Sequence, residues 1–136
     1  MKLNIRSLND TDWDVLQEWW KQWPEWVAPA RDFLPNNGKC GFMVEKNDKP
    51  IIAGFVYLTN SKTALLEWII SDPEYRESDR KDALEMLINT SEGYCKELGY
   101  KYMFSVCRSK KLIETHRKLN WAVDDDPAYE LVKVIN

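Results

Sequence analysis

The sequence has little cysteine, a single histidine and no long apolar run. Its three cysteines, Cys40, Cys95 and Cys107, are too few and too scattered for a disulfide framework or a zinc site. They predict reduced thiols in a cytoplasmic protein without a metal. No apolar stretch approaches the roughly 20 residues that cross a bilayer. The opening residues, Met-Lys-Leu-Asn-Ile-Arg, lack the apolar core of a signal peptide.

Positive charge is not in excess, because 19 Lys and Arg stand against 22 Asp and Glu and the formal net charge is −3. This balance argues against a general nucleic-acid-binding protein. No repeat, linker or low-complexity stretch interrupts the 136 residues, so we expect one domain over residues 1–136. Tryptophan, in contrast, is abundant. Five of the seven lie within fourteen residues, namely Trp13, Trp19, Trp20, Trp23 and Trp26.

The spacing of apolar residues predicts an α+β fold with the element order βααβββαβαββ. Strands are expected at 2–8, 41–45, 51–58, 64–70, 100–107, 121–123 and 129–135. Helices are expected at 11–23, 26–34, 79–98 and 109–119, the first with a capping-box pair of Thr11 and Asp14 and a stop at Pro24. Short turns between the middle strands predict an antiparallel meander, and the later strand–helix–strand connection predicts one parallel pair. We therefore expect a twisted, mostly antiparallel sheet flanked by helices.

Four short motifs occur along the chain in a fixed order. They are Leu66–Arg76, which contains Asp-Pro-Glu-Tyr-Arg, then Ala83–Leu87, Lys118–Trp121 and Tyr129–Lys133. Together with the element order, they resemble the GNAT (Gcn5-related N-acetyltransferase) superfamily over essentially the whole chain. The resemblance implies a GNAT-like fold and an acetyl-CoA-dependent N-acetyltransferase that acts on an amine of a small molecule or peptide.

In that family, the loop after the central strand reads Arg/Gln-x-x-Gly-x-Gly/Ala, and backbone amides at the start of the next helix bind the acetyl-CoA pyrophosphate. Here residues 76–81 read Arg-Glu-Ser-Asp-Arg-Lys, so Asp79 and Lys81 occupy the glycine positions. Three readings are open: Asp79 caps the helix and occupies those amides, the cations of the loop bind phosphate through their side chains, or the charges are solvated on a first helical turn. The resemblance implies the following cofactor-binding residues: Ile69, Ile70, Ser71, Arg76, Ser78, Asp79, Arg80, Lys81 and Ser109.

Two side chains are candidates for proton transfer. Glu67 matches the position of the family's general base on the central strand. His116 stands where the family has an acidic tyrosine, and an imidazolium can protonate a departing thiolate. The alternatives are a glutamate on the exposed side of an alternating strand and a histidine that lies on the helix surface or is partly buried.

The tryptophan-rich region and the altered loop leave a second function open. Trp19, Trp20 and Trp23 share a helix face, so they are core residues, walls of an acceptor groove or part of a docking surface. Loss of the loop glycines also fits a non-catalytic GNAT-fold binding or interaction module that no longer uses acetyl-CoA. The expected partners are acetyl-CoA and an amine substrate for an enzyme, or a homodimer or protein partner through these helices.

Overall fold

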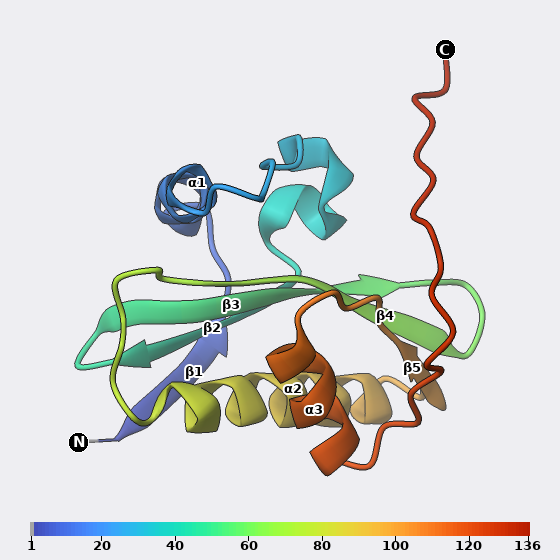
Figure 1. The fold of residues 1–136 in the computed structure, drawn as a ribbon. Helices are drawn as coiled ribbons and strands as arrows, with labels where there is room; N and C mark the ends of the chain where they lie inside the picture. The colour runs from blue at the N-terminus through green and yellow to red at the C-terminus, as the bar shows by residue number, and fades with distance from the viewer. Residues whose placement is uncertain (1) are drawn as a thin grey trace. The chain divides into compact units, whose positions relative to one another are not determined.

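A computed structural model describes residues 2–136 and shows one five-stranded sheet with helices (Figure 1). The strands are β1 (Leu3–Ser7), β2 (Gly41–Lys46), β3 (Lys49–Leu58), β4 (Thr63–Ser71) and β5 (Tyr102–Phe104). The helices are α1 (Asp12–Gln22), α2 (Arg80–Glu97) and α3 (Lys110–Lys118), with 3-10 turns η1 (Arg31–Phe33) and η2 (Pro35–Gly38). The chain divides into two compact units, Met1–Val106 and Cys107–Asn136, which are described separately.

The sheet confirms the predicted α+β class and its topology. Strands β1 to β4 form an antiparallel meander in sequence order, and β5 pairs with β4 in parallel. A tight turn joins β2 and β3, where Asn47 and Asp48 adopt positive φ values of 53° and 63°. Asparagine and aspartate tolerate this conformation better than most residues. The long crossover through α2 gives the one parallel pair, as the strand–helix–strand order predicts.

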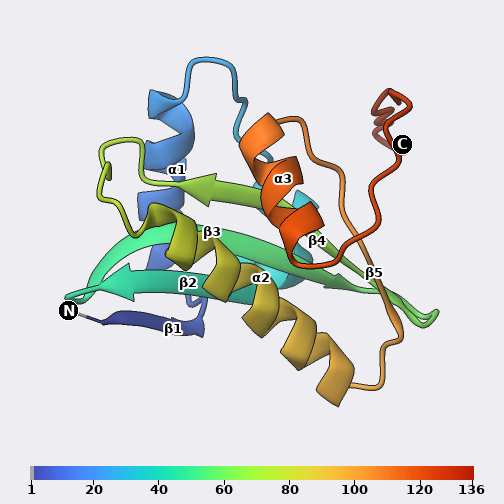
Figure 2. The same cartoon turned by 60° about the horizontal axis from the view of Figure 1, so that its bottom comes forward.

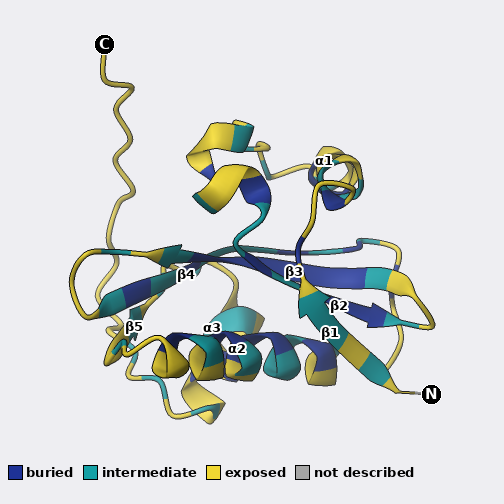
Figure 3. Cartoon of the chain, turned by 180° about the vertical axis from the view of Figure 1, so that it is seen from behind, coloured by how far each residue is buried: buried dark blue, intermediate teal, exposed yellow. Residues whose placement is uncertain are grey.

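Helices cover both faces of the sheet in the first unit. Helix α1 lies on one face and α2 lies on the other, with its apolar side toward the strands (Figures 1 and 2). Because neighbouring residues of a strand point to opposite faces, Met43 packs with the α1 layer and Val44 with the α2 layer. Burial is therefore concentrated in the strands and in the sheet-facing sides of the two helices (Figure 3).

Trp20 is the centre of the α1 layer. Its ring lies 6.1 Å from Trp13, 6.4 Å from Phe55 and 6.3 Å from Trp68, measured between ring centroids. Trp19 and Trp20 are 5% and 2% exposed, which confirms that both are core residues. Edge-to-face and stacked contacts of this kind add roughly 0.5–1.5 kcal/mol each to the area that they bury. Much of the tryptophan in the sequence therefore serves to fix α1 on the sheet.

Two helix predictions are wrong. Residues 26–34 contain only the 3-10 turn η1 instead of a helix, because Pro29 lacks an amide proton and restricts the residue before it. The capping pair of Thr11 and Asp14 is also absent, since Thr11 makes no side-chain cap. Its amide and hydroxyl both donate to Oδ1 of Asn9, which organises the turn before α1.

The two strands predicted at the end of the chain are also wrong. Residues 121–123 and 129–135 have no regular secondary structure, although their sequences alternate as strands do. A strand needs hydrogen-bonding partners as well as a suitable pattern. In the part of the chain that the structure describes, no helix combines the length and apolar character that a bilayer crossing requires.

Arg6 links three segments at the base of α1. Its guanidinium donates to both oxygens of Asp12 at 2.8 Å and to Oε2 of Glu45 at 3.0 Å. Burial opposes ionisation of Asp12, whose side chain is only 3% exposed. Hydrogen bonds from Arg6 and from the Asn9 amide outweigh this burial and hold the pKa of the Asp12 carboxyl below its usual value. Ionised Asp12 thus ties the first helix to β1.

We predict that Arg6→Met lowers the free energy of unfolding at neutral pH by on the order of 2–3 kcal/mol, because it leaves a buried carboxylate without its partner. Since the folded-state pKa of Asp12 is depressed, this contribution is present above the ordinary aspartate value of about 4 and is lost as the pH falls further. Urea titrations at several pH values should show the difference narrowing below about pH 4. The exposed pair of Arg117 and Asp125 provides the control, since Arg117→Met should cost about 1 kcal/mol or less. An equal difference at every pH would contradict this account.

Candidate functional site

Glu67 lies where β4 and β5 stop pairing. The parallel ladder joins Thr63–Leu65 to Tyr102–Phe104 and extends no further along β4. Just past its end, Oε2 of Glu67 accepts a hydrogen bond from the backbone amide of Val106 at 2.9 Å. The half-buried carboxylate of Glu67 thus bridges the two segments after their backbones have separated. The hydrogen bond to Val106 therefore holds Glu67, the predicted base, just past the end of the β4–β5 ladder.

The next residue distorts β4. Trp68 has φ of +57°, and the pairing of β3 with β4 shifts so that Trp68 and Ile69 together face Gly54. A positive φ is rare for a bulky residue and costs on the order of 1–3 kcal/mol. Packing of Trp68 against Trp20 and against Phe33, whose ring centroid lies 5.8 Å away, offsets this cost. Such bulges are common next to active sites, where they redirect side chains.

The three strand residues predicted to contact a cofactor are Ile69, which belongs to this bulge, and Ile70 and Ser71, which follow it. Ile70 is 3% exposed and belongs to the α1 side of the core, while half-buried Ile69 packs on the α2 side. The carbonyl oxygen of Ser71 accepts a hydrogen bond from the indole Nε1 of Trp23 at 2.9 Å. Trp23 is half-buried, and this hydrogen bond connects the end of α1 to the end of β4.

The alternative in which Asp79 caps α2 is wrong. Asp79 occupies the N-cap position, but its side chain makes no hydrogen bond to the amides of the helix. Instead, Oδ2 accepts from Nζ of Lys46 at 2.7 Å, and Oδ1 accepts from the hydroxyl of Tyr75. The hydrogen bond from Lys46, and to a smaller extent the one from Tyr75, holds the pKa of the Asp79 carboxyl below its usual value. The first turn of α2 therefore keeps amides that no side chain caps, and such groups with the helix dipole attract anions.

Three cations accompany these amides. Arg76 and Lys81 are exposed and Arg80 is half-exposed, and within residues 2–136 none of the three side chains forms an ion pair or hydrogen bond. Ser78 in the same loop is exposed. Of the two carboxylates in the loop, Asp79 pairs with Lys46, whereas Glu77 is exposed. The loop can therefore offer amides, a hydroxyl and unpaired positive charge to a phosphate group.

Ser109 and His116 lie in the second unit and are linked through Leu112. Ser109 caps α3, since its Oγ accepts from the Leu112 amide at 3.5 Å. Nδ1 of His116 lies 2.7 Å from the Leu112 carbonyl oxygen, so Nδ1 carries the proton of the neutral ring. Burial lowers the pKa of His116, and the hydrogen bond to Leu112 only partly opposes this shift. The structure therefore favours a neutral imidazole, packed edge-on against Trp121 at 4.7 Å, with a buried and unpaired Nε2.

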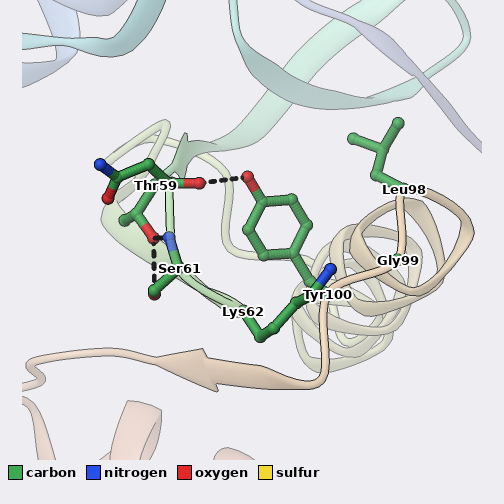
Figure 4. A pocket seen from close by; sticks show the side chains of 7 residues that line it. Thr59, Ser61, Lys62, Leu98, Gly99 and Tyr100 are labelled. Atoms are coloured by element: carbon green, nitrogen blue, oxygen red, sulfur yellow. Dashed lines mark hydrogen bonds between the residues drawn. The ribbon is translucent and has the colours of Figure 1, made fainter.

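A small polar hollow lies at the other end of α2. Thr59, Lys62, Leu98 and Tyr100 are among its lining residues, and the Tyr100 hydroxyl donates to the Thr59 carbonyl oxygen at 2.6 Å (Figure 4). The 18 residues of α2 separate this hollow from the 76–81 loop by about 27 Å along the helix axis. It is therefore distinct from the candidate site. Among the described residues, no three His, Cys, Asp or Glu side chains are grouped to bind a metal.

Comparisons with known proteins identify the fold. No protein-family model matches the chain, and no curated protein matches it in sequence. The ribosomal-protein-S18-alanine N-acetyltransferase of Escherichia coli matches it in structure with a TM-score of 0.70 and 18% identity, over 87% of this chain and 76% of that one. An aminoglycoside acetyltransferase from an uncultured soil metagenomic sample matches with a TM-score of 0.67 and 12% identity, over 98% and 97%. The aminoglycoside N-acetyltransferase AAC(6')-Iy, in complex with a CoA bisubstrate analogue, gives 0.65 and 17%, over 98% and 100%.

The chain has the GNAT fold. This finding confirms the GNAT-like fold that the resemblance implies. Sequence reasoning missed Lys46 and Tyr75, the two partners of Asp79. Lys46 gives no signal, because it lies 33 positions away in the sequence and its role depends on the pairing of the sheet.

Proposed function

We propose that this GNAT-fold chain is an acetyl-CoA-dependent N-acetyltransferase acting on an amine of a small molecule or peptide. The observation that carries the proposal is the uncapped start of α2 with unpaired cations beside it. When bound, acetyl-CoA supplies the acetyl group as a thioester.

The 76–81 loop is proposed to hold the diphosphate. Backbone amides of the first turn of α2 donate hydrogen bonds to an anion without competition from an aspartate cap. Arg76, Arg80 and Lys81 add charge, and Ser78 adds a hydroxyl donor. Two glycine positions of the family are filled by Asp79 and Lys81, so side chains replace part of what a glycine-rich loop gives through its backbone. We propose that Ile69–Ser71 flank the rest of the cofactor.

Glu67 is proposed as the general base. An amine at neutral pH is mostly protonated, and it becomes a nucleophile only when it loses that proton. The Val106 amide holds the carboxylate at the point where β4 and β5 part. His116 as the acid and Ser109 as a cofactor contact stay predictions. The acid role requires protonation of Nε2, which the burial of His116 opposes.

The second candidate is the non-catalytic binding module. It is favoured by the two acidic side chains in the loop, Glu77 and Asp79, which repel a diphosphate wherever they are not neutralised. Lys46 removes this objection for Asp79 but not for exposed Glu77. Binding of CoA therefore separates the two candidates before any acceptor amine is known.

We predict that calorimetric titration with CoA shows saturable binding and that Arg80→Ala weakens it about tenfold, which corresponds to about 1.4 kcal/mol. Arg76→Ala should have a similar effect, because a hydrogen bond to a charged group is worth roughly 1.5–3 kcal/mol. The matched control is Lys96→Ala, an exposed cation in the last turn of the same helix, which should leave the affinity unchanged. Absence of CoA binding would remove the enzyme proposal and leave the binding module.

We predict that Glu67→Gln lowers kcat by about 10²–10⁴-fold with a panel of amines while CoA affinity stays the same. Glutamine keeps an oxygen that accepts from the Val106 amide, so the change removes the charge and retains the contact. Residual activity of the variant should rise with pH, because the free amine then forms in solution. Release of CoA thiol provides the assay. Normal turnover in Glu67→Gln would dismiss Glu67 as the base.

A further inference from the structure

The bulge in β4 places the proposed base and an indole ring on one face of the sheet. Glu67 lies directly opposite Phe55 in the ladder with β3, and opposite residues share a face. Phe55 belongs to the core layer under α1. Because the bulge interrupts the alternation of β4, the next side chain, Trp68, also packs into this layer, against Trp20 and Phe33. A carboxylate and an indole from consecutive residues therefore point to the same side.

Phe33 and Trp68 form an aromatic corner on this face. Their ring planes meet at 88°, and their ring centroids are 5.8 Å apart. Trp68 is half-buried, and the Phe33 side chain at the end of η1 is 46% exposed. Two perpendicular rings leave space for a third flat ring that stacks on one of them and meets the edge of the other. The aromatic corner therefore fits a flat ring better than a flexible alkyl chain.

Tyr57 holds the aromatic corner in place and lies close to the carboxylate. It follows Phe55 by two positions on β3, so it shares the face of Glu67 and lies diagonally across from it. Its hydroxyl donates to the carbonyl oxygen of Phe33 at 2.9 Å, which ties η1 to the sheet on the side of α1 (Figure 1). Burial, and to a smaller extent the charge of Glu67, raises the pKa of Tyr57 to about 12. The corner is thus ordered before a ligand binds, which lowers the entropic cost of binding.

The charges near this corner suit an amine and not an acid. Glu67 supplies a carboxylate, and the faces of aromatic rings attract cations. Residues 31–39 carry two cations, Arg31 and Lys39, and both pair with Asp10. Neither cation of this segment is therefore left to bind a carboxylate group of a substrate.

We infer that the acceptor is a primary amine that carries an aromatic ring and no carboxylate next to the amine, with its ring in the aromatic corner and its nitrogen at Glu67. This inference names the substrate class and rests on the proposed acetyltransferase function. The amine gives a proton to Glu67 and its nitrogen forms the amide bond, while the thioester C–S bond breaks and CoA leaves as the thiol. A free arylalkylamine and a peptide with an aromatic first residue share this chemistry.

Two matched pairs of amines test the substrate class by release of CoA thiol. We expect kcat/KM for phenethylamine to exceed that for cyclohexylethylamine, which has the same skeleton without a flat ring, by about fivefold or more. Phenylalaninamide should exceed leucinamide in the same way if the ring comes from a peptide, so the pairs distinguish the two sources. Phenylalanine, with its carboxylate, should be a poor substrate. Turnover without preference for the aromatic member of either pair would overturn the inference and leave the acetyltransferase proposal intact.

Phe33→Leu removes the exposed ring and keeps an apolar side chain. It should raise KM for the preferred aromatic amine about fivefold, whereas Phe33→Tyr keeps the ring and should preserve the low value. The matched control is Phe42→Leu, which removes a half-buried ring from the α2 side of the sheet and should change KM by about twofold or less. Equal KM values for Phe33→Leu and the unchanged chain would contradict the assigned position of the ring.

A binding measurement separates this inference from the enzyme proposal. NMR titration with phenethylamine and with phenylalaninamide, with and without CoA, should shift the indole N–H resonance of Trp68, which Trp68→Phe identifies. Phe33→Leu should weaken the response about fivefold. A shift without release of CoA thiol from any amine would remove the enzyme proposal and keep the aromatic amine site. Release of CoA thiol with no shift at Trp68 would do the opposite.

Discussion

The position of the Asp79 carboxylate decides whether α2 can bind an anion. Aspartate at an N-cap position normally accepts hydrogen bonds from the first helical amides. Here Lys46 at the end of β2 and Tyr75 in the preceding turn take both of its oxygens. The sheet thus determines the state of the helix terminus, because Lys46 lies where it does through the pairing of β2 with β1 and β3. The 76–81 loop lacks the glycines of the GNAT family. The ion pair of Lys46 with Asp79 nevertheless leaves the first amides of α2 without a side-chain cap.

The rest of the site depends on the same sheet. The ring of Trp68 packs edge-on against Trp20 and Phe33, so the tryptophan-rich layer stabilises an unfavourable backbone in β4. Glu67 precedes this bulge and bonds the Val106 amide beyond the end of the β4–β5 ladder. The packing around Trp68 thus stabilises the bulge that directly follows Glu67, the proposed base.

The sequence predicts the elements whose signals are local. The β2–β4 meander and α2 follow from alternating and helical spacing, and Pro24 correctly marks the end of α1. The predictions of secondary structure and capping fail where a distant residue or a backbone constraint determines the local structure. Pro29 prevents the second helix, residues 129–135 form no strand despite their alternating pattern, and the Asp79 carboxylate bonds Lys46 instead of capping α2. Pro29 is a local signal that the helical spacing overrode. The other two outcomes have no local signal, because each depends on chain segments that meet only in the fold.

The most direct measurement is a double-mutant cycle of Lys46→Met and Asp79→Asn, read out as CoA affinity by calorimetry. If Lys46 acts by restraining Asp79, Lys46→Met alone weakens binding about tenfold, or about 1.4 kcal/mol. The same change has little effect once Asp79→Asn has removed the negative charge. Equal losses in both backgrounds, or no loss when Lys46 is replaced in the otherwise native chain, would contradict the account.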